Sequence, residues 1–123
     1  MPVRPSPLVW FFEPLERESG YRLKRMFGCD AAYIDGMLYL VVADQDEPWN
    51  GLMVCTSKDR HAALIETMPA LHPHPVLGKW LYVSQSHPAF ETLTEQLVAL
   101  VLRRDERIGV APKPRRRPAR KIS

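Results

Sequence analysis

The alternation of apolar and polar positions predicts an antiparallel meander of four strands as the centre of this chain. Four apolar runs, each bounded by glycine or by polar turn residues, form it: residues 22–28, 29–34, 37–42 and 51–55. Asp35-Gly36 separates the second run from the third and favours a type I′ hairpin, because this turn requires positive φ at both central positions. Residues 43–50 are polar and contain Pro48, which indicates a longer loop before the fourth strand.

Helices are predicted on both sides of the meander. A short helix is expected within residues 8–19, where an apolar run is followed by Pro14, which cannot donate a backbone hydrogen bond. After the fourth strand, Thr56 or Ser57 is a suitable N-cap for a second helix, which Pro69 ends.

A further strand and helix are predicted in the second half of the chain. The proline-spaced histidines of residues 72–75 predict a polyproline-like connector, and residues 76–84 have the composition of a fifth strand. A last helix is expected from Ser86 to about Asp105. Its apolar residues recur at helical spacing, and its acidic residues precede its basic ones, as the helix dipole favours.

This order of helix, four strands, helix, strand and helix predicts an α+β fold. We expect a two-layer sandwich in which helices cover an antiparallel sheet of about five strands. Residues 8–109 are long enough to form a single domain with its own core. The proline-rich residues 1–7 predict a flexible leader, and residues 110–123, which lack apolar content, predict a disordered basic tail.

The strands of the meander are apolar at both alternating sets of positions, whereas a sheet with one solvated face should alternate with polar residues. Either helices cover both faces, or the second face meets another subunit. The three predicted helices allow either arrangement; for the second we expect a homodimer, whose candidate interface is one alternating set of strand residues: Met37, Tyr39, Val41 and Met53.

The charge of the chain is divided between its body and its C-terminal end. Of 17 basic residues, six lie within residues 112–123, which hold no acidic residue: Lys113, Arg115, Arg116, Arg117, Arg120 and Lys121. The rest of the chain holds 11 basic and 14 acidic residues, so the formal charge of +3 comes from the tail. Unopposed cations neutralise phosphates, and the tail is therefore our candidate for contact with nucleic acid.

Candidate chemistry elsewhere is sparse. Cys29 and Cys55 lie in apolar runs, where reduced cysteine packs as a small hydrophobe, although a bridge between two meander strands is conceivable. No three histidine, cysteine or carboxylate residues have the spacing of a metal site, and we expect no metal, no cofactor and no catalytic residues. No apolar run approaches the ~20 residues of a spanning helix, so a cytoplasmic protein without membrane contact is expected.

Two neighbouring motifs carry a resemblance to a known family. Residues 24–28 are Lys-Arg-Met-Phe-Gly, and residues 32–37 are Ala-Tyr-Ile-Asp-Gly-Met. They resemble the N-terminal domain family of the bacterial competence regulator TfoX, in which a basic-Met-Phe-Gly stretch precedes a strand, a glycine turn and another strand. Segments similar to small stand-alone members follow at residues 50–52, 77–80 and 102–109. The resemblance covers residues about 20 to 110.

The resemblance implies an α+β domain that is often dimeric and has no established catalytic residues. Two departures bear on a regulatory role. A basic tail follows residue 110, where the full-length regulators have a separate helical domain, and Cys29 stands where the family has a second glycine.

These observations favour a non-enzymatic interaction or regulatory module, linked to transcription or nucleic acid through its tail. The alternative is a small-ligand-binding protein or an enzyme with a cleft between the sheet and its helices. Five aromatic residues are candidates to line such a cleft: Trp10, Tyr33, Trp49, Trp80 and Tyr82.

Overall fold

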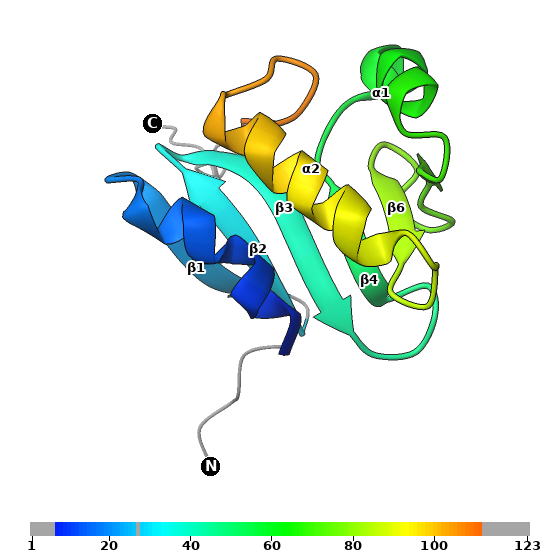
Figure 1. Ribbon diagram of the computed structural model, residues 1–123, viewed down its shortest axis with the longest axis horizontal. Helices are drawn as coiled ribbons and strands as arrows, with labels where there is room; N and C mark the ends of the chain where they lie inside the picture. The colour runs from blue at the N-terminus through cyan, green and yellow to red at the C-terminus, as the bar shows by residue number, and fades with distance from the viewer. Residues whose placement is uncertain (1–6, 27, 112–123) are drawn as a thin grey trace, which may run out of the picture.

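The structure is a computed structural model, and it describes residues 7–26 and 28–111. Helices cover one face of a six-stranded antiparallel sheet, which confirms the predicted α+β sandwich (Figure 1). The leader residues 1–6 and the tail residues 112–123 lie outside the described part. Within that part, no helix combines the length and apolar character that crossing a membrane requires.

The strand order in the sheet is β1-β2-β3-β4-β6-β5. The elements follow one another along the chain as η1 (Pro7–Arg17), β1 (Tyr21–Met26), β2 (Cys29–Ile34), β3 (Met37–Asp44), β4 (Asn50–Val54), η2 (Lys58–Arg60), α1 (His61–Thr67), β5 (His72–Pro73), β6 (Leu81–Ser84) and α2 (Phe90–Leu102).

The helical layer consists mainly of η1 and α2, which lie side by side across the sheet (Figure 1). Both are amphipathic, and their apolar sides pack on the strands in what we call the helix-side core. Phe12, Leu15 and Leu97 are fully buried there. The first helix occupies the predicted position, but it is a 3-10 helix with Pro14 inside it.

The meander is confirmed, including its central turn. Asp35 has φ 52° and Gly36 has φ 83°, so both central residues of the turn adopt the positive φ that a type I′ hairpin requires. The β2–β3 pairing then changes register: Ala32 pairs with Leu40, but Tyr33 pairs with Leu38. Tyr39 is the extra residue of this bulge, and both Tyr39 and Leu40 pack in the helix-side core.

Residues 56–84 differ from the prediction in several boundaries. Ser57 is the N-cap of η2, a single 3-10 turn, before α1 begins at His61. The expected polyproline connector instead contributes the short edge strand β5. The expected fifth strand is shortened to β6, because the His74 amide donates to the Trp80 carbonyl (2.9 Å) and closes residues 74–80 into a loop. We call residues 74–80 the rim loop.

The C-terminal part of the described chain completes the sheet. α2 ends at Leu102, before the expected Asp105, and residues 105–110 then turn back to β3. Leu38 and Val110 exchange two backbone hydrogen bonds of 3.0 and 2.9 Å. Val110 thereby belongs to the sheet rather than to the predicted tail.

Candidate functional site

One face of the sheet is covered by no described helix, and we call it the helix-free face. The buried apolar side chains of η1, α1 and α2 all belong to the helix-side core. The opposite face has its own buried cluster: Cys29, Ala31, Leu38, Val41, Ala43, Met53, Cys55 and Tyr82. This face is apolar at its centre, as the doubly apolar strands predict.

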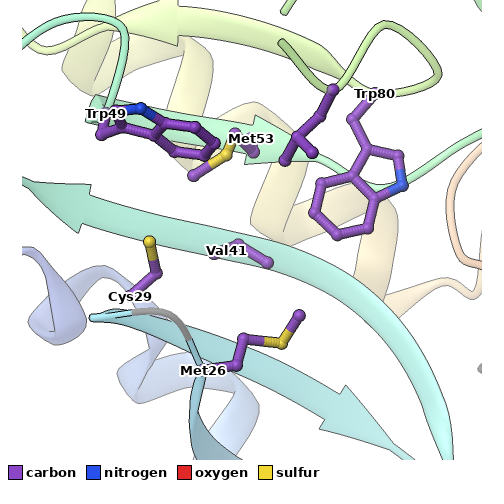
Figure 2. Close-up of a pocket in the computed structure, with 7 residues that line it drawn as sticks. Met26, Cys29, Val41, Trp49, Met53 and Trp80 are labelled. Atoms are coloured by element: carbon purple, nitrogen blue, oxygen red, sulfur yellow. The ribbon is translucent and has the colours of Figure 1, made fainter.

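A pocket of about 340 Å³ opens on the helix-free face, and it exposes only apolar atoms. Its lining comes from four strands, the hairpin before β4 and the rim loop: Met26, Cys29, Val41, Trp49, Met53, Leu77 and Trp80. Figure 2 shows the indole rings of Trp49 and Trp80 on either side of Met53, with Val41, Cys29 and Met26 on the strands beyond.

The pocket has a buried floor and a more exposed rim. Val41 and Met53 are register partners on β3 and β4, and they are only 2% and 0% exposed. Trp49, Leu77 and Trp80 pack over this floor and are half-buried. A partner approaching this face would therefore touch the rim residues first.

A buried histidine ties two walls of the pocket together. The Nδ1 atom of His74 accepts hydrogen bonds from the amides of Val76 and Leu77, each 3.0 Å long. Nδ1 must then be unprotonated, so Nε2 carries the proton and donates to the Pro48 carbonyl (2.7 Å). The His74 ring also lies 4.5 Å from the ring of Trp49. One imidazole thus holds the rim loop against the segment that carries Trp49.

Burial lowers the pKa of His74, and the nearby His72 lowers it further, while the bond to Pro48 acts in the opposite direction. His74 is only 1% exposed, so one histidine of the predicted polyproline-like connector is buried, whereas His72 is exposed. The neutral ring serves as a positioning group for the pocket walls. Burial in a satisfied hydrogen-bond network leaves it no free nitrogen for a ligand.

A polar cluster supports the same wall from the other side. The Tyr82 hydroxyl donates to Glu47 Oε1 (2.8 Å) and accepts from the Asn50 amide (3.0 Å). Hydrogen bonds from Ser84 and Tyr82 lower the pKa of Glu47, and burial together with donation to Glu47 raises the pKa of Tyr82 to about 12. Glu47 remains exposed, and it is the anionic group nearest this end of β6.

The structure separates the four residues that the sequence proposed for a dimer interface. Val41 and Met53 lie on the helix-free face, in the floor of the pocket. Met37 and Tyr39 pack with the helix-side core, because the bulge at Tyr39 reverses the alternation that would have kept all four together. The six basic tail residues proposed for nucleic-acid contact lie outside the described residues.

The aromatic residues proposed for a cleft are also divided. Tyr33, Trp49, Trp80 and Tyr82 gather on the helix-free face, and Trp10 stacks on Phe11 in η1. Trp49 and Trp80 line the pocket, which is on the side of the sheet away from the helices rather than between the sheet and its helices. The sequence did not indicate that Met26 and Leu77 line the pocket. Leu77 was assigned to a strand, and nothing local in the sequence distinguishes it.

The two cysteines and the histidines form no reactive group in the described residues. Cys29 and Cys55 are not joined by a disulfide: Cys29 lies in β2 and Cys55 follows β4, with β3 between these two strands, so the conceivable bridge does not form. Burial raises the pKa of both thiols. No three histidine, cysteine or carboxylate side chains among the described residues converge as metal ligands would.

Comparisons of this chain with protein-family models, curated proteins and solved structures found no match. The resemblance to the TfoX N-terminal domain family therefore stays a prediction from the residues that carry it. The geometry of the helix-free face is the observation on which a functional proposal can rest.

Proposed function

We propose that this protein is a non-enzymatic interaction module that forms a homodimer through its helix-free face. The observation that carries the proposal is the apolar pocket, rimmed by tryptophan and leucine, on a sheet face that no described helix covers. Apolar surface of this kind is typical of protein contact sites, whose centres are rich in tryptophan and methionine and poor in charge.

The composition of the pocket favours a protein partner over a small metabolite. Metabolite sites combine apolar walls with a few polar groups that orient the ligand. This pocket exposes only apolar atoms, and the nearby polar groups of His74 and Tyr82 are engaged with the protein itself. An apolar side chain needs no such orienting group, so it fits the lining better than a polar ligand would.

The resemblance to the TfoX N-terminal domain supports the same class of function, since that family is often dimeric and has no established catalytic residues. We propose a regulatory role in a bacterial cytoplasm on this basis. Two buried cysteines that form no disulfide fit a reducing compartment.

Sedimentation equilibrium of the full chain tests the dimer. We expect a mass that approaches twice the monomer mass of 14.1 kDa as the protein concentration rises. The apolar rim supplies the driving force, since burial of apolar surface is the main favourable term in association. A mass of one chain at every concentration would reject the proposal.

The basic tail supports a second proposal, that the module contacts nucleic acid without sequence preference. Six cations lie in a segment without a single acidic residue. We expect the unmodified chain to bind duplex DNA, and replacement of Arg115, Arg116 and Arg117 by glutamine to weaken that binding. The slope of log affinity against log salt should fall by about 0.9 for each lost phosphate contact.

A titration of labelled DNA at several salt concentrations measures both effects. Arg17→Gln, Lys58→Gln and Arg103→Gln together are the matched control, because these three basic residues are exposed on the body of the protein and the control also removes three charges. An unchanged salt slope in the tail variant, or no binding by the unmodified chain at low salt, would contradict the tail proposal.

A further inference from the structure

We propose that each subunit of the homodimer inserts Val76 into the apolar pocket of the other subunit. This inference rests on the proposed function and adds the geometry of the contact. It follows from three features of the described residues: an exposed apolar side chain, a pocket whose wall includes the next residue of the same loop, and charges of opposite sign on the two sides of the helix-free face.

Val76 is an apolar side chain without a buried environment of its own. It is 64% exposed, against 51% for Trp10 and 37% for Leu23, the other exposed large hydrophobic residues of the described chain. Trp10 lies in η1, and Leu23 pairs with Ala32, whose side chain is in the helix-side core. Val76 instead belongs to the rim loop, directly beside Leu77 in the pocket wall.

The kind of assembly depends on whether the projecting side chain and the pocket that receives it lie on the same face of the molecule. When both lie on the same face, two copies can satisfy each other through a twofold axis, and the assembly closes as a dimer. A projection on the opposite layer, as at Trp10, would make a head-to-tail contact, which leads to a ring or an open filament rather than a twofold dimer. Val76 belongs to the loop that forms one wall of the pocket, and this proximity favours a closed dimer.

The helix-free face has a raised half and a lower half. The rim loop packs over β4 and β6, since Leu77 and Trp80 contact the cluster there. On β1, Arg22 and Lys24 are exposed on the same face, because they pair with Tyr33 and Ala31. A twofold axis parallel to the strands would lay the rim loop of each copy over the β1–β2 half of the other, beside its Met26 and Cys29.

One cross-strand row shows that charges also match in this arrangement. The row runs Lys24, Ala31, Val41, Met53, Tyr82 through successive register pairs. Lys24 is at the β1 end of the row, and Tyr82, which pairs onward with His72 of the edge strand β5, donates to the exposed Glu47. A twofold axis over Val41 reverses the row, so Lys24 of one copy faces the Tyr82–Glu47 pair of the other, and His72 lies beyond that pair. Opposite charges then meet at both edges of the interface.

The tail is a poorer occupant for the pocket. Residues 112–123 hold six cations, and Ile122 is their one large apolar residue. A pocket that exposes only apolar atoms offers those cations no partner, and desolvating an unpaired charge is costly.

A cross-link to the native Cys29 tests the inference directly. Cys29 lines the pocket, and Cys55 is fully buried, so Cys29 is the thiol that an inserted group can reach. In the full chain carrying Val76→Cys, mild oxidation at alkaline pH should join the new thiol to Cys29 of the other copy. Disulfide formation needs the two Cα atoms within about 7 Å, which insertion would provide.

Two controls separate the outcomes. Val76→Cys combined with Cys29→Ser should lose the cross-linked dimer, and Leu23→Cys should not form one with Cys29. A sample that sediments as a dimer but forms no Cys29 link, or whose link persists without Cys29, would overturn the insertion and leave the homodimer standing. A monomer in sedimentation, with no cross-link, would overturn both the insertion and the proposed function.

Discussion

Replacing Gly51 by alanine is expected to lower the free energy of unfolding by about 3 kcal/mol. Gly51 lies in β4 opposite Ser84 of β6. A Cβ atom at this position would lie 2.1 Å from the Val83 carbonyl oxygen and 2.9 Å from both the Gln85 amide nitrogen and the Ser84 Cα. All three are backbone atoms of the neighbouring strand, so no side-chain rotation can relieve the clash, and β4 and β6 must move apart.

Gly78→Ala is the matched control for this experiment. A Cβ atom at Gly78 meets no heavy atom within 4 Å, and its backbone does not have a positive φ. We expect its effect to stay within about 0.5 kcal/mol, as for most exposed substitutions. Chemical denaturation followed by circular dichroism, at one protein concentration for both variants, measures the difference. Equal stability losses in the two variants would contradict the close strand approach at Gly51.

Local features of the fold could be predicted from the sequence because their determinants are local. The type I′ turn depends on two adjacent residues, Asp35 and Gly36, and both have the predicted φ. The doubly apolar strands likewise predicted that the second face of the sheet would be apolar. That face carries a buried cluster of its own.

Features set by contacts between distant residues could not be predicted in the same way. The bulge at Tyr39 depends on the pairing of β2 with β3, and it moves Met37 and Tyr39 away from the proposed interface. Strict alternation along one strand gives no indication of such a shift. A list of apolar strand positions therefore combined residues of both faces, and only Val41 and Met53 of the four lie on the helix-free face.

The rim loop shows the same limit more clearly. Its shape depends on His74, which contacts Pro48, 26 residues earlier in the chain. The sequence around His74 suggested an exposed connector, since histidine and proline alternate there. Only the folded chain shows that the ring is buried, and that it aligns Leu77 and Trp49 as two walls of one pocket.

Leu77→Asp is expected to dissociate the homodimer. The substitution places a carboxylate in the rim of the apolar pocket, where a second copy would have to desolvate it. The Leu77 backbone amide still donates to His74, so the rim loop keeps its anchor. We expect Leu77 to be a hot spot of the interface; loss of a hot spot costs at least about 2 kcal/mol, which raises the dissociation constant roughly thirtyfold.

Leu23→Asp is the control that makes this result specific to one face. It is the same change of residue, in a side chain that is 37% exposed and directed toward the helical layer from the edge strand β1. Both variants gain one negative charge, so any effect of net charge on association is shared. Thermal unfolding of each variant checks that it remains folded.

Light scattering of the two variants at one protein concentration, chosen where the unmodified chain is dimeric, tests the proposed interface most directly. We predict that Leu23→Asp keeps twice the monomer mass of 14.1 kDa and that Leu77→Asp gives the mass of a single chain. Equal masses for the two folded variants would contradict association through the helix-free face.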